Sequence, residues 1–542
     1  MQPMTVTEIA AVVSGVWWNP CEQVPAISAV STDSRNITPG CLFLPWVGEQ
    51  FDGHNFIDAA LDAGAAGCLC AKLPQDIRPD KFYIKVADTR LALRDMASAY
   101  RDKFDIPFVQ ITGSVGKTTT KEMIAAVLGA KLNVLKTPEN FNNDIGTPLT
   151  LFGLSPEHQA AVIETGMNHF GESEYLGAMV RPDIAVISNI GDAHIEYLGS
   201  RGGILKAKCE IFEHLKDDGI AILNGDDALL DTVTLPQRII RCGQSEHCQV
   251  RISDILDHGV NGITCTVTSE KDVYHLNIPA PGEHMAYAAS IAVAVGEALG
   301  LSKEEIIRGV AAYAPIGSRM HILRLSDGRV LLDDCYNANP QSVSAALEVL
   351  ARTECERRVA VLGDMGELGD LTEQAHFNAG ALAAMLGIDF VVAIGSKAVK
   401  IADGAAMGGA EVLHFATREE AMPTLREQLQ PHTTMLIKAS HAMHFEEIVK
   451  ELQINGLVKS FEVGQNILDG ITFQIDQGQR VGLLGKNGAG KSTLFKILTG
   501  ELEHDEGTVT IAPGRRIGLI SQIPVYPDGY TVEDVLRSAF DR

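Results

Sequence analysis

Two glycine-rich loops in this sequence end in a lysine and a hydroxyl residue, an arrangement suited to binding nucleotide phosphates. The first loop lies between the apolar run FVQIT and the helix-like run KEMIAAVLGA. Its glycines let backbone N–H groups point at phosphate oxygens, and the following helix adds the positive end of its dipole. We expect Lys117 to bridge the terminal phosphates of ATP and the Thr118 hydroxyl to bind Mg²⁺. The predicted ATP-binding residues of this loop are Gly113, Ser114, Val115, Gly116, Lys117, Thr118 and Thr119.

Two side chains that suit metal binding follow other apolar runs. Glu164 ends the run AAVIE, and His194 follows the run AVISNIGD. Because the carboxyl ends of parallel strands meet at one edge of a sheet, we expect both side chains to lie near the first loop. Phosphoryl transfer between anionic partners requires metal ions and cationic side chains. We therefore predict that Glu164 and His194 bind Mg²⁺.

The elements that must position these residues are short apolar strands separated by helical stretches. FVQITG, AAVIETG and DIAVISNIG predict a mostly parallel sheet, and GRVLLDD, RRVAVLGD, DFVVAIG and TMLIKAS begin a second series of the same kind. A strand-rich stretch with hairpin-like turns precedes the second loop. The predicted fold class is α/β throughout. The expected domains are residues 1–88, 89–313, 314–452 and 453–542.

Composition excludes several classes of protein. The chain has 542 residues and a formal net charge of −24, without the basic stripe of a nucleic-acid binder. Its ten cysteines include no CxxC pair, which favours free thiols in a reducing compartment. We find no signal peptide and no apolar run long enough to span a bilayer. We expect a cytoplasmic protein that neither binds nucleic acid nor inserts into a membrane.

The first loop, TGSVGKTTT, resembles the ATP loop of the Mur ligase family, which builds the peptide stem of peptidoglycan precursors. The similarity extends over residues 1–452, through TPENFNNDIGTPLTL, ETGMNHFGE, NIGDAHIEYLGS, KAKCEIF, GSRM, DDCYNANPQS, VLGDMGELG and KASHAMHFEE. The pattern is most similar to the members that add D-alanyl-D-alanine to UDP-N-acetylmuramoyl-tripeptide. It implies a UDP-sugar-binding N-terminal domain, a central ATPase domain and a Rossmann-like C-terminal domain. It also implies an acyl-phosphate intermediate, with ATP and Mg²⁺ as cofactors, and a monomeric ligase.

The resemblance assigns roles to further residues. Lys208 matches a lysine that the family carbamylates with CO₂, which makes it a ligand of Mg²⁺ beside Thr118, Glu164 and His194. Carbamate forms only on a neutral amine, so the pKa of Lys208 must be depressed. The implied catalytic residues are Lys117, Lys208, Glu164, His194 and Arg319, and Asp334 is an implied ATP contact. The implied substrate-binding residues are Ser34, Arg35, Asn140, Asn142, Asn143, Tyr336, Asn337 and Asn339. Ala288 departs from the family, which has an asparagine there that helps hold adenine.

The second loop fits GxxxxGK[ST] in full and resembles the start of an ABC-type ATPase, close to the ABC-F class. Its nucleotide-binding residues by this resemblance are Phe461, Gly485, Gly490, Lys491, Ser492 and Gln522. No LSGGQ-like signature and no apolar run ending in Asp-Glu follows Gln522. We therefore expect a truncated ABC domain that does not hydrolyse ATP.

Two other functions stay open on the sequence alone. One is a related ATP-dependent ligase with another acceptor, such as an enzyme that polyglutamylates folate. The other is an ABC-type translation factor that acts through the C-terminal module.

Overall fold

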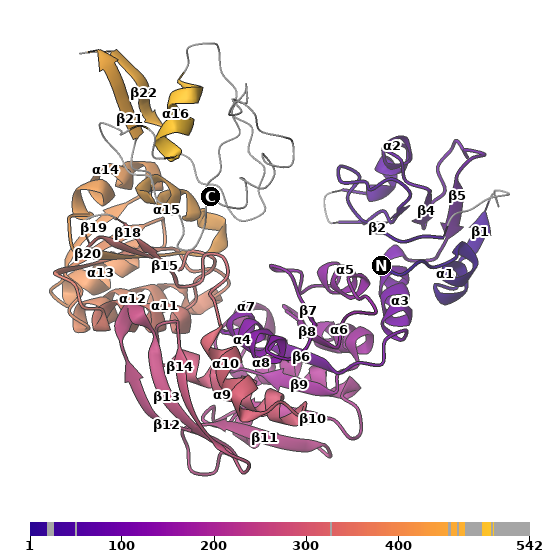
Figure 1. Ribbon diagram of the computed structural model, residues 1–542, viewed down its shortest axis with the longest axis horizontal. Coiled ribbons are helices and arrows are strands. Elements are labelled where there is room, and N and C mark those ends of the chain that lie inside the picture. Colours follow the sequence, from indigo (N-terminus) through magenta and orange to yellow (C-terminus); the bar gives the residue numbers. More distant parts are fainter. Residues whose placement is uncertain are drawn as a thin grey trace, which may run out of the picture. The chain divides into compact units, whose positions relative to one another are not determined.

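The structure is a computed structural model that describes residues 1–18, 26–48, 51–325, 328–453, 457–462, 465–471, 490–499 and 502. The chain divides into two compact units, Met1–Glu446 and Glu447–Arg542. The first unit contains three sheets that follow one another along the sequence, each packed against helices (Figure 1). The mixed α/β class predicted from the alternating apolar and helical stretches is confirmed.

The first sheet has the strand order β1-β5-β4-β3-β2, in which only β1 is antiparallel to its neighbour. Its strands are β1 (Val16–Trp18), β2 (Val30–Ser31), β3 (Leu42–Phe43), β4 (Gly67–Cys70) and β5 (Phe82–Lys85), with α1 (Val6–Val12), η1 (Gly53–Phe56) and α2 (Ile57–Asp62) beside them. Helix α3 (Thr89–Arg101) follows, and its apolar face shares one hydrophobic core with this sheet and with the next part of the chain.

The second sheet has nine strands in the order β14-β13-β12-β11-β10-β9-β6-β8-β7. They are β6 (Phe108–Thr112), β7 (Val134–Lys136), β8 (Ala160–Glu164), β9 (Ile184–Ile187), β10 (Ile220–Asn224), β11 (Arg238–Gly243), β12 (Val250–Asp257), β13 (Ile263–Thr268) and β14 (Val273–Ile278). Strands β6 to β12 are parallel to one another, as predicted, because helical crossovers join most of them. An antiparallel ribbon of β12, β13 and β14 extends the sheet (Figure 1).

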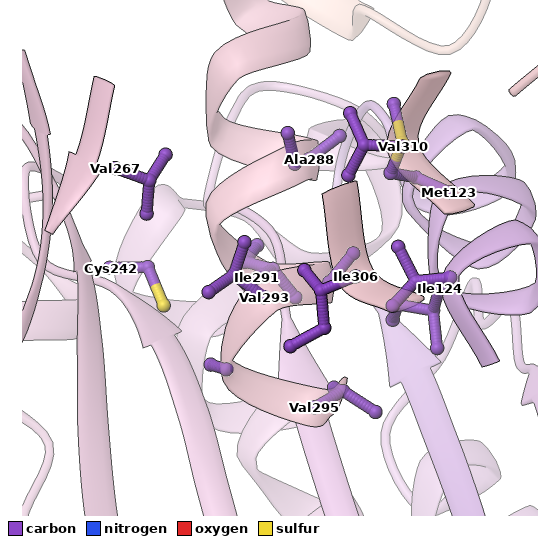
Figure 2. Close-up of a cluster of buried hydrophobic side chains, with 14 of the residues drawn as sticks. Met123, Ile124, Cys242, Val267, Ala288, Ile291, Val293, Val295, Ile306 and Val310 are labelled. Carbon is purple, nitrogen blue, oxygen red and sulfur yellow. The ribbon is translucent and has the colours of Figure 1, made fainter. Parts of the chain in front are cut away.

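The helices of this part are α4 (Lys117–Gly129), α5 (Gly146–Phe152), α6 (Glu172–Val180), α7 (Ile195–Leu198), α8 (Arg201–Cys209), α9 (His284–Ala298) and α10 (Lys303–Ala311). Helix α9 is apolar on nearly every side and is buried accordingly. Figure 2 shows Ile291 and Val293 of α9 between Cys242 of β11 and Ile306 of α10. This core fixes α4, and therefore the phosphate loop that precedes it, against the sheet.

The third sheet has the order β15-β16-β20-β17-β18-β19, parallel except for β15. Its strands are β15 (His321–Arg324), β16 (Val330–Asp333), β17 (Arg357–Gly363), β18 (Phe390–Ile394), β19 (Glu411–Phe415) and β20 (Thr433–Lys438). Its helices are α11 (Pro340–Arg352), α12 (Thr372–Met385), α13 (Val399–Met407) and α14 (Arg418–Gln428). Asn339 caps α11 through its side chain and places the loop after β16 at the carboxyl edge of the sheet.

Near and beyond the boundary at Glu446, the structure describes α15 (Glu446–Gln453), a hairpin of β21 (Leu457–Glu462) and β22 (Gln465–Ile471), and α16 (Lys491–Leu498). Gly490 precedes α16 with a φ of 81°, so the GKS part of the second loop begins a helix. Gly485 and Gln522 lie outside the described residues, and Phe461 lies within β21. In the described part of the chain, no helix is long and apolar enough to cross a membrane.

Candidate active site

A cavity of about 780 Å³ collects most of the predicted site residues at the carboxyl edges of the second and third sheets. It is lined by Ser114, Val115, Gly116, Lys117, Thr118, Thr119, Asn142, Asn143, Glu164, His194, Arg319, Asp334, Tyr336, Asn337 and Asn339. The predicted residues Ser34, Arg35, Gly113, Asn140 and Lys208 are not part of its lining. One cavity therefore joins the first phosphate loop to the loop that follows β16.

The phosphate loop is held in shape before any ligand binds. Gly113 and Gly116 have φ values of 155° and 76°, and a Cβ on Gly113 would lie 2.0 Å from the Ser188 hydroxyl, so that position requires glycine. The loop after β9 braces it, since Val115 N donates to Asn189 Oδ1 at 2.9 Å. Lys117 Nζ donates to Gly113 O at 2.7 Å. Burial lowers the pKa of Lys117, although the nearby Glu164 carboxylate opposes this effect.

Glu164 ends β8 with its side chain 1% exposed, and its two oxygens differ in their surroundings. Oε1 accepts a hydrogen bond from Asn142 Nδ2 at 2.9 Å, whereas Oε2 is buried without a hydrogen-bond partner in the described structure. The Lys121 ammonium lies 3.7 Å from Oε2. A buried carboxylate oxygen without a hydrogen bond is costly unless a cation or donor reaches it, which fits a metal ligand.

Lys121 is a residue that our reading of the sequence missed. It is almost fully buried on α4, where Nζ donates to Thr137 O at 2.7 Å and pairs with Glu122 at 3.0 Å. Its position four residues after Lys117 puts both lysines on one face of the helix. The four-residue spacing could have indicated that Lys121 lies near Lys117, but nothing local in the sequence distinguishes a buried lysine from a solvated one.

His194 precedes α7 with a φ of 64°, and its imidazole contacts the part of the chain built on the third sheet. Nδ1 lies 2.6 Å from Oε2 of Glu367, which follows β17 in the segment VLGDMGELG. The contact does not meet the geometric criteria of a hydrogen bond, so it is a close polar contact between the two side chains. The contact with His194 lowers the pKa of Glu367. Glu367 was also missed, because its partner is distant in sequence.

Lys208 lies on α8 and is 1% exposed. Burial, reinforced by the positive charge of Lys117, lowers its pKa well below the usual value for lysine. No hydrogen bond or ion pair of its amine is present among the described residues. A neutral buried amine is the state that carbamylation requires.

The described residues contain no group of three or more His, Cys, Asp or Glu side chains placed to hold a metal ion by themselves. The donors present nevertheless fit Mg²⁺ bound together with a nucleotide. Such sites take one or two protein carboxylates and complete their shell with substrate phosphates and water. Glu164 Oε2 and the hydroxyl of Thr118 supply oxygen donors beside the phosphate loop.

The loop after β16 forms the opposite wall of the cavity. Lys438 Nζ donates to Asp334 Oδ2 at 2.6 Å and to Asn337 O at 2.9 Å, and Asp334 Oδ1 accepts from Met320 N at 3.0 Å. The Arg319 guanidinium lies 3.9 Å from the centroid of the Tyr336 ring. Lys438 thus fixes a wall that presents a cation, an aromatic ring and amides to a ligand.

The remaining predicted substrate contacts are less concentrated. Asn143 Oδ1 caps the start of α5 by accepting from Gly146 N at 2.8 Å. Arg35 lies in the loop between β2 and β3 of the first sheet, where it is exposed and pairs with Asp33 at 2.8 Å. This pairing, led by the Arg35 hydrogen bond, lowers the pKa of Asp33. The structure does not bring Ser34 or Arg35 into the cavity.

Comparison with known proteins assigns a family to this architecture. Residues 26–101 match the Mur ligase family catalytic domain, residues 111–296 the Mur ligase middle domain, and residues 318–441 the glutamate ligase domain of Mur ligases. Residues 468–535 match the ABC transporter family.

Curated relatives cover most of the chain. UDP-N-acetylmuramoyl-tripeptide–D-alanyl-D-alanine ligase of Bacillus subtilis is 37% identical over 451 residues, which are 83% of this chain and 98% of that protein. The Escherichia coli ligase of the same name is 38% identical over 439 residues, 79% and 94% of the two chains.

Solved structures agree with these relatives. A crystal structure of MurF from Acinetobacter baumannii superposes with a TM-score of 0.78 at 33% identity, covering 84% of this chain and 99% of that one. MurF ligase from Thermotoga maritima in complex with ADP gives a TM-score of 0.70 at 25% identity, covering 78% and 97%.

Proposed function

Because this chain belongs to the Mur ligase family, we propose that it joins D-alanyl-D-alanine to UDP-N-acetylmuramoyl-tripeptide and forms ADP and phosphate from ATP. It is an ATP-dependent ligase of peptidoglycan precursor synthesis. One observation carries the proposal: a single cavity holds a preformed phosphate loop, a buried carboxylate oxygen without a hydrogen bond, and a facing wall of Arg319, Tyr336 and Asn337.

The reaction proceeds through an acyl phosphate. A terminal carboxylate oxygen of the tripeptide attacks the γ-phosphorus of ATP, and ADP leaves. The amine of the dipeptide, after losing a proton, attacks the acyl carbon and expels phosphate as the amide bond forms. Lys117 stabilises charge on the transferred phosphoryl group from its position at the start of α4. Arg319 adds a second cation from the opposite wall.

Mg²⁺ supplies charge neutralisation between the phosphates and the attacking carboxylate when it is bound. Thr118, Glu164 and His194 are the residues that would hold it. We propose that Lys208 joins them as a carbamate, formed when its neutral amine attacks CO₂ and loses a proton. The depressed pKa of this buried amine supports the assignment.

The substrates divide between the two ends of the site. Asp334 is the proposed ATP contact on the C-terminal ligase domain, where Tyr336, Asn337 and Asn339 face the dipeptide. Asn140, Asn142 and Asn143 face the muramoyl peptide, and Ser34 with Arg35 contacts the UDP-sugar. We place the ligase in the cytoplasm, as a monomer, with domains at residues 1–88, 89–313 and 314–452. The segment from residue 453, part of which matches the ABC transporter family, does not contribute to ligation in this proposal.

Phosphate release measured with each substrate omitted in turn tests this function. Full turnover should require ATP, UDP-N-acetylmuramoyl-tripeptide and D-alanyl-D-alanine together, and Lys117→Ala should reduce the rate by about 10²–10³-fold. Equal turnover with folate and glutamate would instead identify a folate-type ligase. ATP hydrolysis that needs neither substrate and disappears in Lys491→Ala would identify the ABC module as the active part.

A further inference from the structure

The loop of residues 189–194, which follows β9, contacts both the phosphate loop and the C-terminal ligase domain. On one side, Asn189 Oδ1 accepts from Val115 N at 2.9 Å and Gly191 N donates to Ser114 Oγ at 2.8 Å. On the other side, Gln341 at the start of α11 lies so close to Gly191 that an added Cβ would be 1.9 Å from its Oε1 atom. The loop therefore lies in direct contact with both the phosphate loop and the start of α11.

His194 and Glu367 form the second contact of this loop with the C-terminal ligase domain, and both have unusual backbones. Their φ values are 64° and 60°, in the left-handed region that non-glycine residues seldom adopt. Such conformations are strained for non-glycine residues and persist where surrounding structure defines them, most often at functional sites. Here they bring His194 Nδ1 and Glu367 Oε2 to 2.6 Å.

We propose that Glu367 is a positioning residue, which holds the Nδ1 edge of His194 so that Nε2 faces the cavity only when the C-terminal ligase domain is docked on the 189–194 loop. The proposal rests on the proposed function, because it requires His194 to bind the cation that accompanies ATP. A carboxylate behind a metal-binding histidine fixes the tautomer and orientation of the ring and raises its basicity as a ligand. In this protein the carboxylate and the histidine belong to different domains.

The separation of the pair between domains has a functional consequence. The domain that supplies Glu367 also carries Tyr336 and Asn337, which line the cavity and are the proposed dipeptide contacts. Docking thus completes the cation site and the acceptor wall in one movement. By thermodynamic linkage, cation binding must favour docking by the same factor as docking favours cation binding.

Mn²⁺ titration followed by electron paramagnetic resonance tests the proposal, with the full chain saturated with ADP and UDP-N-acetylmuramoyl-tripeptide. His194→Ala should abolish one Mn²⁺ site. Glu367→Ala and Glu367→Gln should weaken Mn²⁺ binding at that same site by about 10–100-fold, the usual effect of removing such a supporting group. Glu373→Gln is the matched control, because Glu373 is an exposed carboxylate on α12 of the same domain, and it should leave Mn²⁺ affinity unchanged.

A double-mutant cycle separates positioning from a purely structural link between the domains. If Glu367 acts through His194, Glu367→Ala should cause no further loss of Mn²⁺ affinity in a His194→Ala background. An unchanged Mn²⁺ affinity in Glu367→Gln, with a raised KM for the dipeptide alone, would overturn the proposal and leave a simple domain contact. Glu367→Gln keeps the side chain's volume and decides the question if Glu367→Ala folds poorly. Failure of the parent protein to form product would count against the proposed ligase function instead.

Discussion

Lys438 and Asp334 form an ion pair of 2.6 Å at the carboxyl ends of the neighbouring strands β20 and β16. Their side chains are 2% and 16% exposed, so the pair is largely removed from water. The same ammonium donates to Asn337 O and thereby fixes the loop that carries Tyr336. The pair links the core of the third sheet to the wall of the active site.

Replacing Lys438 with methionine should destabilise the C-terminal ligase domain, because it leaves the Asp334 carboxylate without its partner. Loss of one member of a buried pair costs about 3–5 kcal/mol, and partial exposure of Asp334 places the expected loss at the lower end of this range. The apparent midpoint of urea unfolding should fall accordingly. Lys400→Met is the control, because its pair with Asp403 is exposed and should contribute less than about 1 kcal/mol. Equal midpoints for the two variants would show that the Lys438–Asp334 pair contributes no more to stability than the exposed Lys400–Asp403 pair.

Lys208→Ala should be nearly inactive, because neither a carbamate nor another oxygen donor can then form at that position. Short carboxylic acids such as acetate should restore part of the activity by supplying the missing oxygens. Lys206→Ala, on the exposed side of the same helix, should behave like the parent protein. Phosphate-release rates measured with and without acetate give the comparison, and full activity of Lys208→Ala without acetate would rule out the carbamate.

The buried Lys208 amine should also make stability depend on pH in buffer free of CO₂. Its pKa is lowered in the folded protein and normal, near 10.5, in the unfolded chain. Between these two values the unfolded state binds more protons, so the free energy of unfolding should rise with pH. Lys208→Met lacks this penalty, and its advantage over the parent should be greatest at the low end of the window and vanish near pH 10.5. Parallel stability curves for the two proteins would contradict the burial of this amine.

Deleting residues 453–542 should leave ligase activity intact, because every ligase motif precedes Gln453. The cut keeps Ile448, Val449 and Leu452, the buried residues of α15. Lys491→Ala in the full chain should match the parent as well, since we propose that ATP turnover occurs at the first loop. Steady-state rates of both proteins provide the measurement. A large loss in either one would make the C-terminal segment a working partner of the ligase.

Much of the site could be predicted from local pattern. The apolar runs before Gly113, Glu164 and His194 placed these residues at strand ends, and the parallel order of β6, β8 and β9 brings those ends together. The glycine loop needed no long-range information, since its turn and its helix are adjacent in sequence. The fold class followed from the same alternation of strands and helices.

The rest depends on contacts between distant residues. The pairing of His194 with Glu367 joins two domains, and no periodicity in either segment encodes it. Burial of Lys121 and Lys208 reflects what packs over α4 and α8, which a helical pattern of mixed residues does not show. The sequence pattern also gave no indication of the antiparallel ribbon that ends the second sheet, because alternation of apolar and polar residues in a strand does not specify which strand pairs with it.

In the proposed reaction, ATP activates a carboxylate in the cavity beside Lys117, and an amine then displaces phosphate. Tripeptide substrate labelled with ¹⁸O in its terminal carboxylate reports on both steps when the phosphate and the UDP-muramoyl product are analysed by mass spectrometry. The expected result is one ¹⁸O atom in each phosphate released and a product whose mass is that of the labelled tripeptide substrate plus one D-alanyl-D-alanine, minus one H₂¹⁸O. Unlabelled phosphate, released whether or not the dipeptide is present, would contradict it.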